Sequence, residues 1–191
     1  MKKITLFAFM VLFTGSLFAQ NVETENLFDE DFRRGYIGFT FGPAFPTGDI
    51  DKDAISGGAH LNIVNFGYLF SKNVGIAATW FGTSFISKDD NKSGIGLGGI
   101  MAGPLLSTAS QNRKMEYDLK PMIGFANGTV IENNKNSSSS RTIALGIGGA
   151  LRLNCWKMVS LSVGIDYYNS KPESIDLSSY ALVFGVNYRL K

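Results

Sequence analysis

The chain has 191 residues, with 18 Lys and Arg, 16 Asp and Glu, one His and one Cys, and a formal net charge of +2 at pH 7. This balance lacks the basic excess that nucleic-acid binding uses, and a single cysteine allows neither an internal disulfide nor a metal site of its own. Glycine contributes 22 residues and aromatics 13% of the chain, while good helix-forming runs are scarce, which favours an all-β protein.

Residues 1–19 have the organisation of a secretory signal peptide, with two lysines, an apolar run at 4–13 and a short segment that ends at Ala19. The apolar run is shorter than the roughly 20 residues that a membrane-spanning helix needs. Cleavage after Ala19 removes both lysines and leaves sixteen basic against sixteen acidic residues. Residues 20–34 are polar and acidic, and they predict a flexible periplasmic N-terminal segment, with a docked plug or cap as the alternative.

From residue 35 onward, apolar residues recur at every second position in segments separated by turn residues, which predicts β-strands. We expect eight strands, at residues 35–45, 59–70, 74–85, 94–106, 115–130, 141–153, 158–168 and 179–191. The connections after the first, third, fifth and seventh strands are long and polar. The connection after the fifth strand contains a serine tract, which predicts a flexible loop. Long loops at one rim and short turns at the other are typical of up-and-down outer-membrane barrels, which places the barrel at residues 35–191.

The two faces of these strands differ in a way that favours a membrane barrel. A soluble β domain packs its large apolar residues inward, whereas a small membrane barrel directs them to lipid and keeps small or charged residues in its narrow lumen. We assign to lipid Ile37, Phe39, Phe41, Leu145, Ile147, Leu161, Val163, Leu182, Phe184 and Val186, and by the same rule Leu97, Met101 and Leu105. We assign to a lumen-facing charge network Glu116, Asp118, Lys120, Arg152, Asp166 and Arg189.

Some positions do not follow a simple alternation. Asn65 falls on the lipid face of the second strand unless a bulge near Ile63 and Val64 turns Phe66 and its followers outward. The faces of the third strand are nearly equivalent, so its register stays unassigned. Aromatic residues near strand ends suit interfacial girdles or ordinary packing, and these are Tyr36, Phe85, Trp156, Tyr167, Tyr180 and Tyr188.

Four stretches carry a resemblance to a known family: "GFTFGPAFPTGD" at 38–49, "GGIMAGPLL" at 98–106, "ALGIGGALRLN" at 144–154 and the terminal "FGVNYRLK". With them, nearly the whole mature chain resembles the small, porin-like outer-membrane β-barrels of Bacteroidota, which are related in form to OmpA-like and OmpX-like barrels. The resemblance implies an eight-stranded antiparallel transmembrane barrel, outer-membrane lipid and the barrel-assembly machinery as partners, and a role in envelope integrity, surface interaction or limited passage of small molecules.

Catalytic chemistry has weak support in the sequence. "GIGLGG" at 94–99 matches a dinucleotide-binding pattern, but it lacks the strand, helix and βαβ context that the pattern requires. His60 is the only histidine, and with Ser84 and Asp166 near the rim it allows an outer-membrane lipid hydrolase as an alternative.

The sequence therefore predicts a monomeric, non-enzymatic outer-membrane barrel, exported by a cleaved signal peptide, with no catalytic residues, cofactor, metal or nucleic-acid partner. We expect the inner charges to form a salt-bridged plug rather than line a pore, because eight strands leave an interior that side chains fill. A soluble exported β-barrel that binds a small apolar ligand is the alternative from a different class.

Overall fold

The computed structural model describes residues 34–47, 55–88, 93–110, 114–132, 135–171 and 177–191, without the side chains of 55–56 and 131–139. The predicted signal peptide and residues 20–33 of the predicted N-terminal segment lie outside the described residues. No helix within these described ranges is long and apolar enough to cross a membrane.

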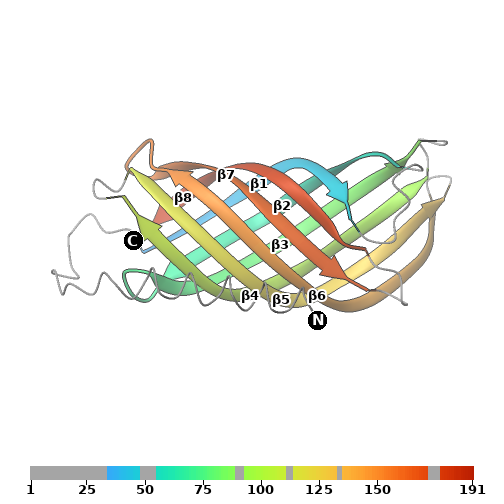
Figure 1. Cartoon of the computed structure of the whole chain (residues 1–191), viewed down its shortest axis with the longest axis horizontal. Helices are drawn as coiled ribbons and strands as arrows, with labels where there is room; N and C mark the ends of the chain where they lie inside the picture. The colour runs from blue at the N-terminus through green and yellow to red at the C-terminus, as the bar shows by residue number, and fades with distance from the viewer. Residues whose placement is uncertain (1–33, 48–54, 89–92, 111–113, 133–134, 172–176) are drawn as a thin grey trace, which may run out of the picture. The chain divides into compact units, whose positions relative to one another are not determined.

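Eight strands form one closed antiparallel barrel, in which each strand pairs with the next and β8 pairs with β1 (Figure 1). The strands are β1 (Gly35–Pro46), β2 (Ile55–Leu69), β3 (Val74–Ser87), β4 (Gly94–Ala109), β5 (Met115–Glu132), β6 (Lys135–Leu153), β7 (Val159–Ser170) and β8 (Ser179–Leu190). The predicted eight-stranded up-and-down barrel is confirmed. Closure gives every strand a partner on both edges in the body of the barrel. The first part of β6, residues 135–143, extends beyond β7 and pairs with β5 alone.

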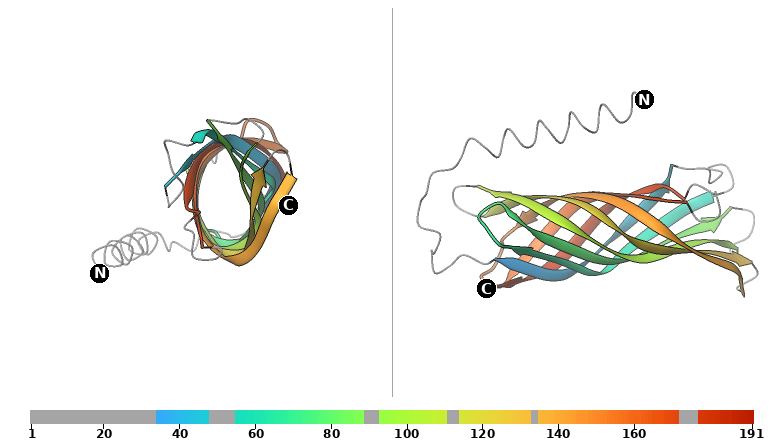
Figure 2. Two further views of the ribbon diagram at one scale, coloured as in Figure 1. Left: turned by 90° about the vertical axis from the view of Figure 1, so that its right-hand side faces the viewer. Right: turned by 90° about the horizontal axis from the view of Figure 1, so that it is seen from below.

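The two ends of the barrel differ in their connections. At one end, which we call the turn end, the first residue of β1 pairs with the last residue of β8, and the connections cover residues 70–73, 110–114 and 154–158. At the other end, which we call the loop end, the connections cover 47–54, 88–93, 133–134 and 171–178. Figure 2 shows the barrel from two further sides, with its strands inclined to its long axis.

The connection after β5 is shorter than the sequence predicted. The expected long serine-rich loop is mostly an extension of the β5–β6 hairpin, in which Thr129 pairs with Ser139 and Val130 with Ser138, and only residues 133–134 separate the strands. The ladder is made by backbone groups, so a tract of serines pairs as readily as other residues once its partner strand continues beside it.

A bulge in β2 sets the orientation of its second half. The register with β3 shifts between Asn62 and Val64, close to where the sequence analysis expected a bulge. Asn65 is consequently buried and Phe70 exposed. The predicted bulge is confirmed, and it brings two asparagines three positions apart into the same lumen.

Three assignments of bulky residues to the outer face were wrong. Leu97, Met101 and Leu105 of β4 point into the barrel and are buried. For Met101, glycines on the two following strands, β5 and β6, leave the space. A Cβ added at Gly124 or Gly146 would lie within 3 Å of the Met101 side chain, which shows that this side chain occupies the space that the two glycines leave.

Two aromatic residues near strand ends also face inward rather than forming a girdle. Tyr36 is 1% exposed and Phe85 is 2% exposed. The girdle interpretation suits only the exposed members of that set, Trp156, Tyr167, Tyr180 and Tyr188. The unassigned third strand directs Phe81 and Phe85 into the barrel and Trp80 outward.

Candidate functional site: the side chains inside the barrel

The lumen near the turn end holds a group of charged side chains around Arg152, which we call the arginine cluster. The Arg152 guanidinium donates two hydrogen bonds to Asp118, from Nε to Oδ2 at 2.7 Å and from Nη2 to Oδ1 at 3.2 Å. Its Nη2 also lies 2.5 Å from Oε2 of Glu116. Because Arg152 is 4% exposed, these charge-assisted contacts replace the water that its cation loses on burial.

Three further side chains complete the arginine cluster. The guanidinium lies over the ring of Tyr36, 4.1 Å from its centroid, which adds a cation–π contact. Ser107 donates a hydrogen bond of 2.8 Å to a carboxylate oxygen of Asp118, and Nη2 of Arg189 lies 3.7 Å from Oε1 of Glu116. The cluster thereby joins side chains from β1, β4, β5, β6 and β8.

A second layer lies farther from the turn end, and we call it the amide layer. Lys120 Nζ donates to Oδ1 of Asn65 at 3.0 Å, and Nδ2 of Asn65 donates to Oδ1 of Asn187 at 3.2 Å. Nδ2 of Asn187 then donates to the hydroxyl of Ser162 at 3.1 Å. This chain of hydrogen bonds runs from β5 across the lumen to β2, and then to β8 and β7.

A third layer, the histidine layer, lies closest to the loop end. The rings of Phe81 and Tyr168 are stacked with centroids 4.5 Å apart, and the His60 ring lies 4.9 Å from that of Tyr168. Nδ2 of Asn62 donates to Oδ2 of Asp166 at 3.0 Å, and the Tyr168 hydroxyl donates to the same oxygen at 3.2 Å. Aromatic packing and polar contacts therefore fill the same cross-section.

These contacts connect opposite walls of the barrel. β3 and β7 are half a circuit apart in the ring of eight strands, and yet Phe81 and Tyr168 stack directly on one another. An eight-stranded barrel has an interior just wide enough for side chains to fill. The lumen is accordingly occupied at three successive heights by interactions that span it.

The structure distributes the six predicted network residues over all three layers. Glu116, Asp118 and Arg152 lie together in the arginine cluster with Arg189 at its edge, whereas Lys120 lies in the amide layer and Asp166 in the histidine layer. Sequence reasoning assigned none of the uncharged members of these layers to the network, among them Tyr36, Asn62, Phe81 and Tyr168. The alternation of β7 indicated the inward direction of Tyr168, but nothing in the sequence indicated the strand it meets.

Of the three residues proposed for a lipid hydrolase, His60 and Asp166 share the histidine layer, but Ser84 does not join them. His60 is buried in the lumen, where Nδ1 lies 2.7 Å from the Thr83 hydroxyl and Nε2 lies 3.1 Å from Oδ1 of Asn62. Ser84 is exposed on the outer face, because neighbouring residues of a strand point to opposite sides. Within the described ranges, no group of three or more His, Cys, Asp and Glu side chains could hold a metal ion.

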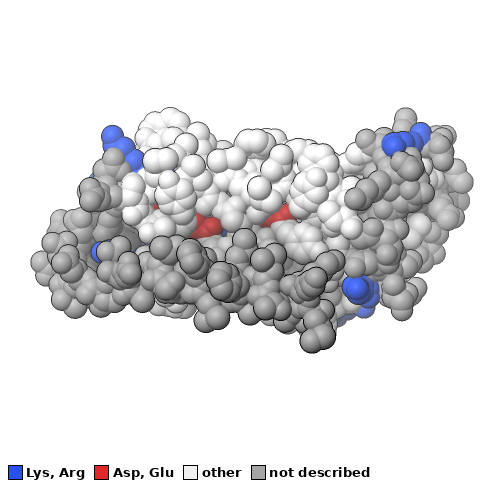
Figure 3. Space-filling model, viewed as in Figure 1, with Lys and Arg blue, Asp and Glu red and all other residues white. Residues whose placement is uncertain are grey.

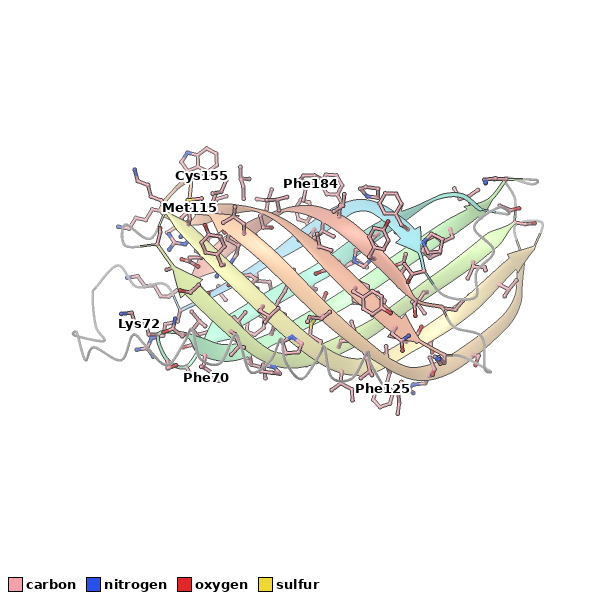
Figure 4. All side chains as sticks on the ribbon, in the orientation of Figure 1. Phe70, Lys72, Met115, Phe125, Cys155 and Phe184 are labelled. Atoms are coloured by element: carbon pink, nitrogen blue, oxygen red, sulfur yellow. The ribbon has the colours of Figure 1, made fainter. Side chains whose placement is uncertain are left out.

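The outer face of the barrel is apolar. Nine of the residues assigned to lipid are 39–55% exposed, namely Ile37, Phe39, Phe41, Leu145, Leu161, Val163, Leu182, Phe184 and Val186, and Ile147 is partly exposed. Phe125 and Phe184 point away from the barrel wall in Figure 4. Figure 3 shows Lys and Arg toward the ends of the visible face and mainly uncharged residues between them.

No protein-family model matches the chain, and neither does any curated protein. Among solved structures, the barrel is similar to Neisserial surface protein A (NspA), with a TM-score of 0.65 and 16% identity over 82% of this chain and 97% of that one. The chain has the fold of small outer-membrane β-barrels.

Two further structures agree with this fold. The outer membrane protein OprG of Pseudomonas aeruginosa gives a TM-score of 0.51 at 13% identity, over 83% of this chain and 97% of that one. Ail, the attachment invasion locus protein of Yersinia pestis, gives 0.50 at 16% identity, over 83% and 99%. At these identities the likeness concerns the fold.

Proposed function

We propose that this protein is an integral β-barrel of the outer membrane, with a lumen closed by side chains and a non-enzymatic role in the structure of the envelope. The observation that carries the proposal is the inversion of the usual soluble pattern. Large hydrophobic side chains are exposed on every strand, while Glu116, Asp118, Lys120, Arg152 and Asp166 are buried.

The inversion has a physical explanation in a bilayer. A soluble monomer rarely exposes an apolar patch larger than a few hundred Å², whereas this barrel exposes apolar side chains around its whole wall. In hydrocarbon these side chains need no cover, and the closed ladder satisfies the backbone groups of the strands. Inside the barrel, Glu116 and Asp118 pair with Arg152. Lys120 and Asp166 are instead hydrogen-bonded to neutral side chains of the amide and histidine layers.

The filled interior supports a structural role over passage of small molecules. Contacts between opposite walls, such as that between Phe81 and Tyr168, leave little room for a permeating molecule. They likewise leave little room for the apolar ligand of a soluble binding barrel. His60 is engaged by Thr83 and Asn62 instead of a serine, which supports a non-enzymatic protein.

The proposal includes export by a signal peptide cleaved after Ala19, insertion by the barrel-assembly machinery and a monomeric state in outer-membrane lipid. The motifs at 98–106 and 144–154 support membership of the small barrels of Bacteroidota. The first motif lies in β4, and the second lies in β6 except for its last residue, Asn154, which follows the strand.

Membrane fractionation tests the location. We expect the protein to stay in the outer-membrane pellet after carbonate and high-salt washes, to require detergent for extraction, and to migrate differently on gels before and after boiling. Release into the supernatant by the washes would instead favour a soluble exported barrel.

Recording in planar bilayers tests the closed lumen. Purified, folded protein should add no stable conductance steps above those of a protein-free bilayer. A matched variant, Tyr168→Ala, removes a ring that crosses the lumen, so it serves as the control most able to open a path. Regular steps from the unsubstituted protein would refute the closed lumen and favour a passage role.

A further inference from the structure

The outer wall contains two adjacent glycines in one cross-strand row near the loop end. Cross-strand pairing aligns Leu61, Gly82, Gly98, Asn127 and Arg141 as successive neighbours on β2 to β6. All five lie on the outward face, because their chain neighbours point into the lumen. The second and third members, Gly82 and Gly98, have no side chains, so the outer surface is depressed at β3 and β4, between β2 and β5.

Bulky side chains border this depression on the side facing the turn end. Ile100 has Trp80 and Phe125 as its cross-strand neighbours on the two sides, and the three are 62%, 49% and 55% exposed. A Cβ added at Gly82 would meet nothing within 4 Å, and one at Gly98 would meet only a carbonyl oxygen at 3.5 Å. We call this concavity the glycine groove.

The glycine groove is large and mostly apolar. It belongs to a concave region of about 1470 Å³, which is lined mainly by outward residues of the wall and also by the inward residues His60, Thr83 and Leu97. Pockets for small ligands are usually about 300–1,000 Å³, so the region exceeds what one small molecule needs. A lipid with several acyl chains is the kind of occupant that a long, shallow, apolar region at membrane height suits.

One end of the glycine groove is polar and cationic. The Arg141 guanidinium lies over the ring of Phe125, 4.7 Å from its centroid, which fixes the cation beside the groove. Among the described residues, no carboxylate forms an ion pair with Arg141. Asn127, Thr129 and the exposed Ser84 also line the region, and they supply hydrogen-bond donors on the side facing the loop end.

We propose that the glycine groove binds a phosphorylated glycolipid of the lipid A type, with acyl chains along the glycines and a phosphate on Arg141. The inference rests on the proposed outer-membrane location, in which the long loops face the cell surface. An arginine guanidinium matches phosphate in geometry and charge. This charge complementarity favours an anionic lipid over a second copy of the chain as the occupant.

Native mass spectrometry of the detergent-solubilised full chain tests the site with diphosphoryl lipid A as the probe. Phosphatidylglycerol serves as a second phosphorylated lipid and phosphatidylcholine as a zwitterionic one. Gly82→Leu fills the groove, and Arg141→Gln removes the cation. The control for Gly82→Leu is Gly149→Leu, because Gly149 is an outward glycine on β6 that also faces open space. The control for Arg141→Gln is Lys88→Gln, because Lys88 is a cation at the loop end outside the groove.

We expect lipid A adducts on the unsubstituted protein, a roughly tenfold loss of binding in Gly82→Leu and in Arg141→Gln, and no change in the two controls. All four variants should keep the heat-dependent gel shift of a folded barrel. Equal binding by all variants, or equal binding of phosphatidylglycerol, would overturn the lipid A site. Dimers that disappear only in Gly82→Leu would assign the groove to a second copy.

The two proposals fail in different ways. Protein that the carbonate wash releases contradicts the outer-membrane location. Protein that stays in the membrane, folds and shows no preference for lipid A contradicts only the site at the glycine groove.

Discussion

Replacing Arg152 tests whether the buried charges hold the barrel together. Arg152→Met removes the guanidinium but keeps most of the aliphatic stem, so the main change is electrostatic. The substitution leaves the carboxylates of Asp118 and Glu116 in the lumen without the cation that contacts both at 2.5–2.7 Å. Breaking a buried ion pair by removing one partner costs about 3–5 kcal/mol, and we expect a loss of that size in the free energy of unfolding.

Urea titration of the barrel in lipid vesicles, followed by tryptophan fluorescence and by the heat-dependent gel shift, measures this loss. Arg141→Met is the matched control, because Arg141 is exposed and its described contact is with the Phe125 ring. A cation–π contact at an exposed site contributes about 0.5–1 kcal/mol, so the control should lose no more than that.

A compensated variant separates charge from packing. Adding Glu116→Gln and Asp118→Asn to Arg152→Met removes the unpaired charges, and it should recover most of the lost stability. The reasoning is refuted if Arg152→Met costs less than about 1 kcal/mol, or if the compensated variant is no more stable than the single one.

Three other predictions concern the lumen and the wall. Gly148→Leu should lower the free energy of unfolding by about 1–3 kcal/mol in the same titration, because its Cβ would lie 2.5 Å from a buried carboxylate oxygen of Asp166. Gly149→Leu, on the outer face, should leave the stability unchanged. Equal losses in the two variants would contradict the lumen assignment. Phe184→Arg should lower the free energy of unfolding in vesicles by about 2–4 kcal/mol. Tyr188→Arg, nearer the turn end, should lower it by only about 0–1 kcal/mol. Equal losses in the two variants would contradict a membrane span. Tyr168→Ala should raise bilayer conductance above that of the unsubstituted protein, whereas an unchanged trace would show that the ring does not limit passage.

Alternation, interrupted by turn residues, determined the number of strands and the faces of β1 and β5 to β8. The lengths of the connections favoured the antiparallel up-and-down order. In those strands most bulky residues share one parity and the charged residues the other, as in β7, where Asp166 lies between the exposed Ile165 and Tyr167. The buried Tyr36, Met122 and Tyr168 are bulky exceptions on the inner face. A period of two is a local property of extended backbone, so the sequence alone carries it.

Only the tertiary structure decided the face of β4 and the partners across the lumen. Alternation shows that a strand has two faces, but it does not show which face is inside when both are apolar. Met101 lies inside because Gly124 and Gly146 leave space beside it, and Tyr168 meets Phe81 because barrel closure sets β7 opposite β3. These contacts depend on how the register shifts add up around the ring. The volume left for each inward side chain is therefore a property of the closed barrel and not of any one strand.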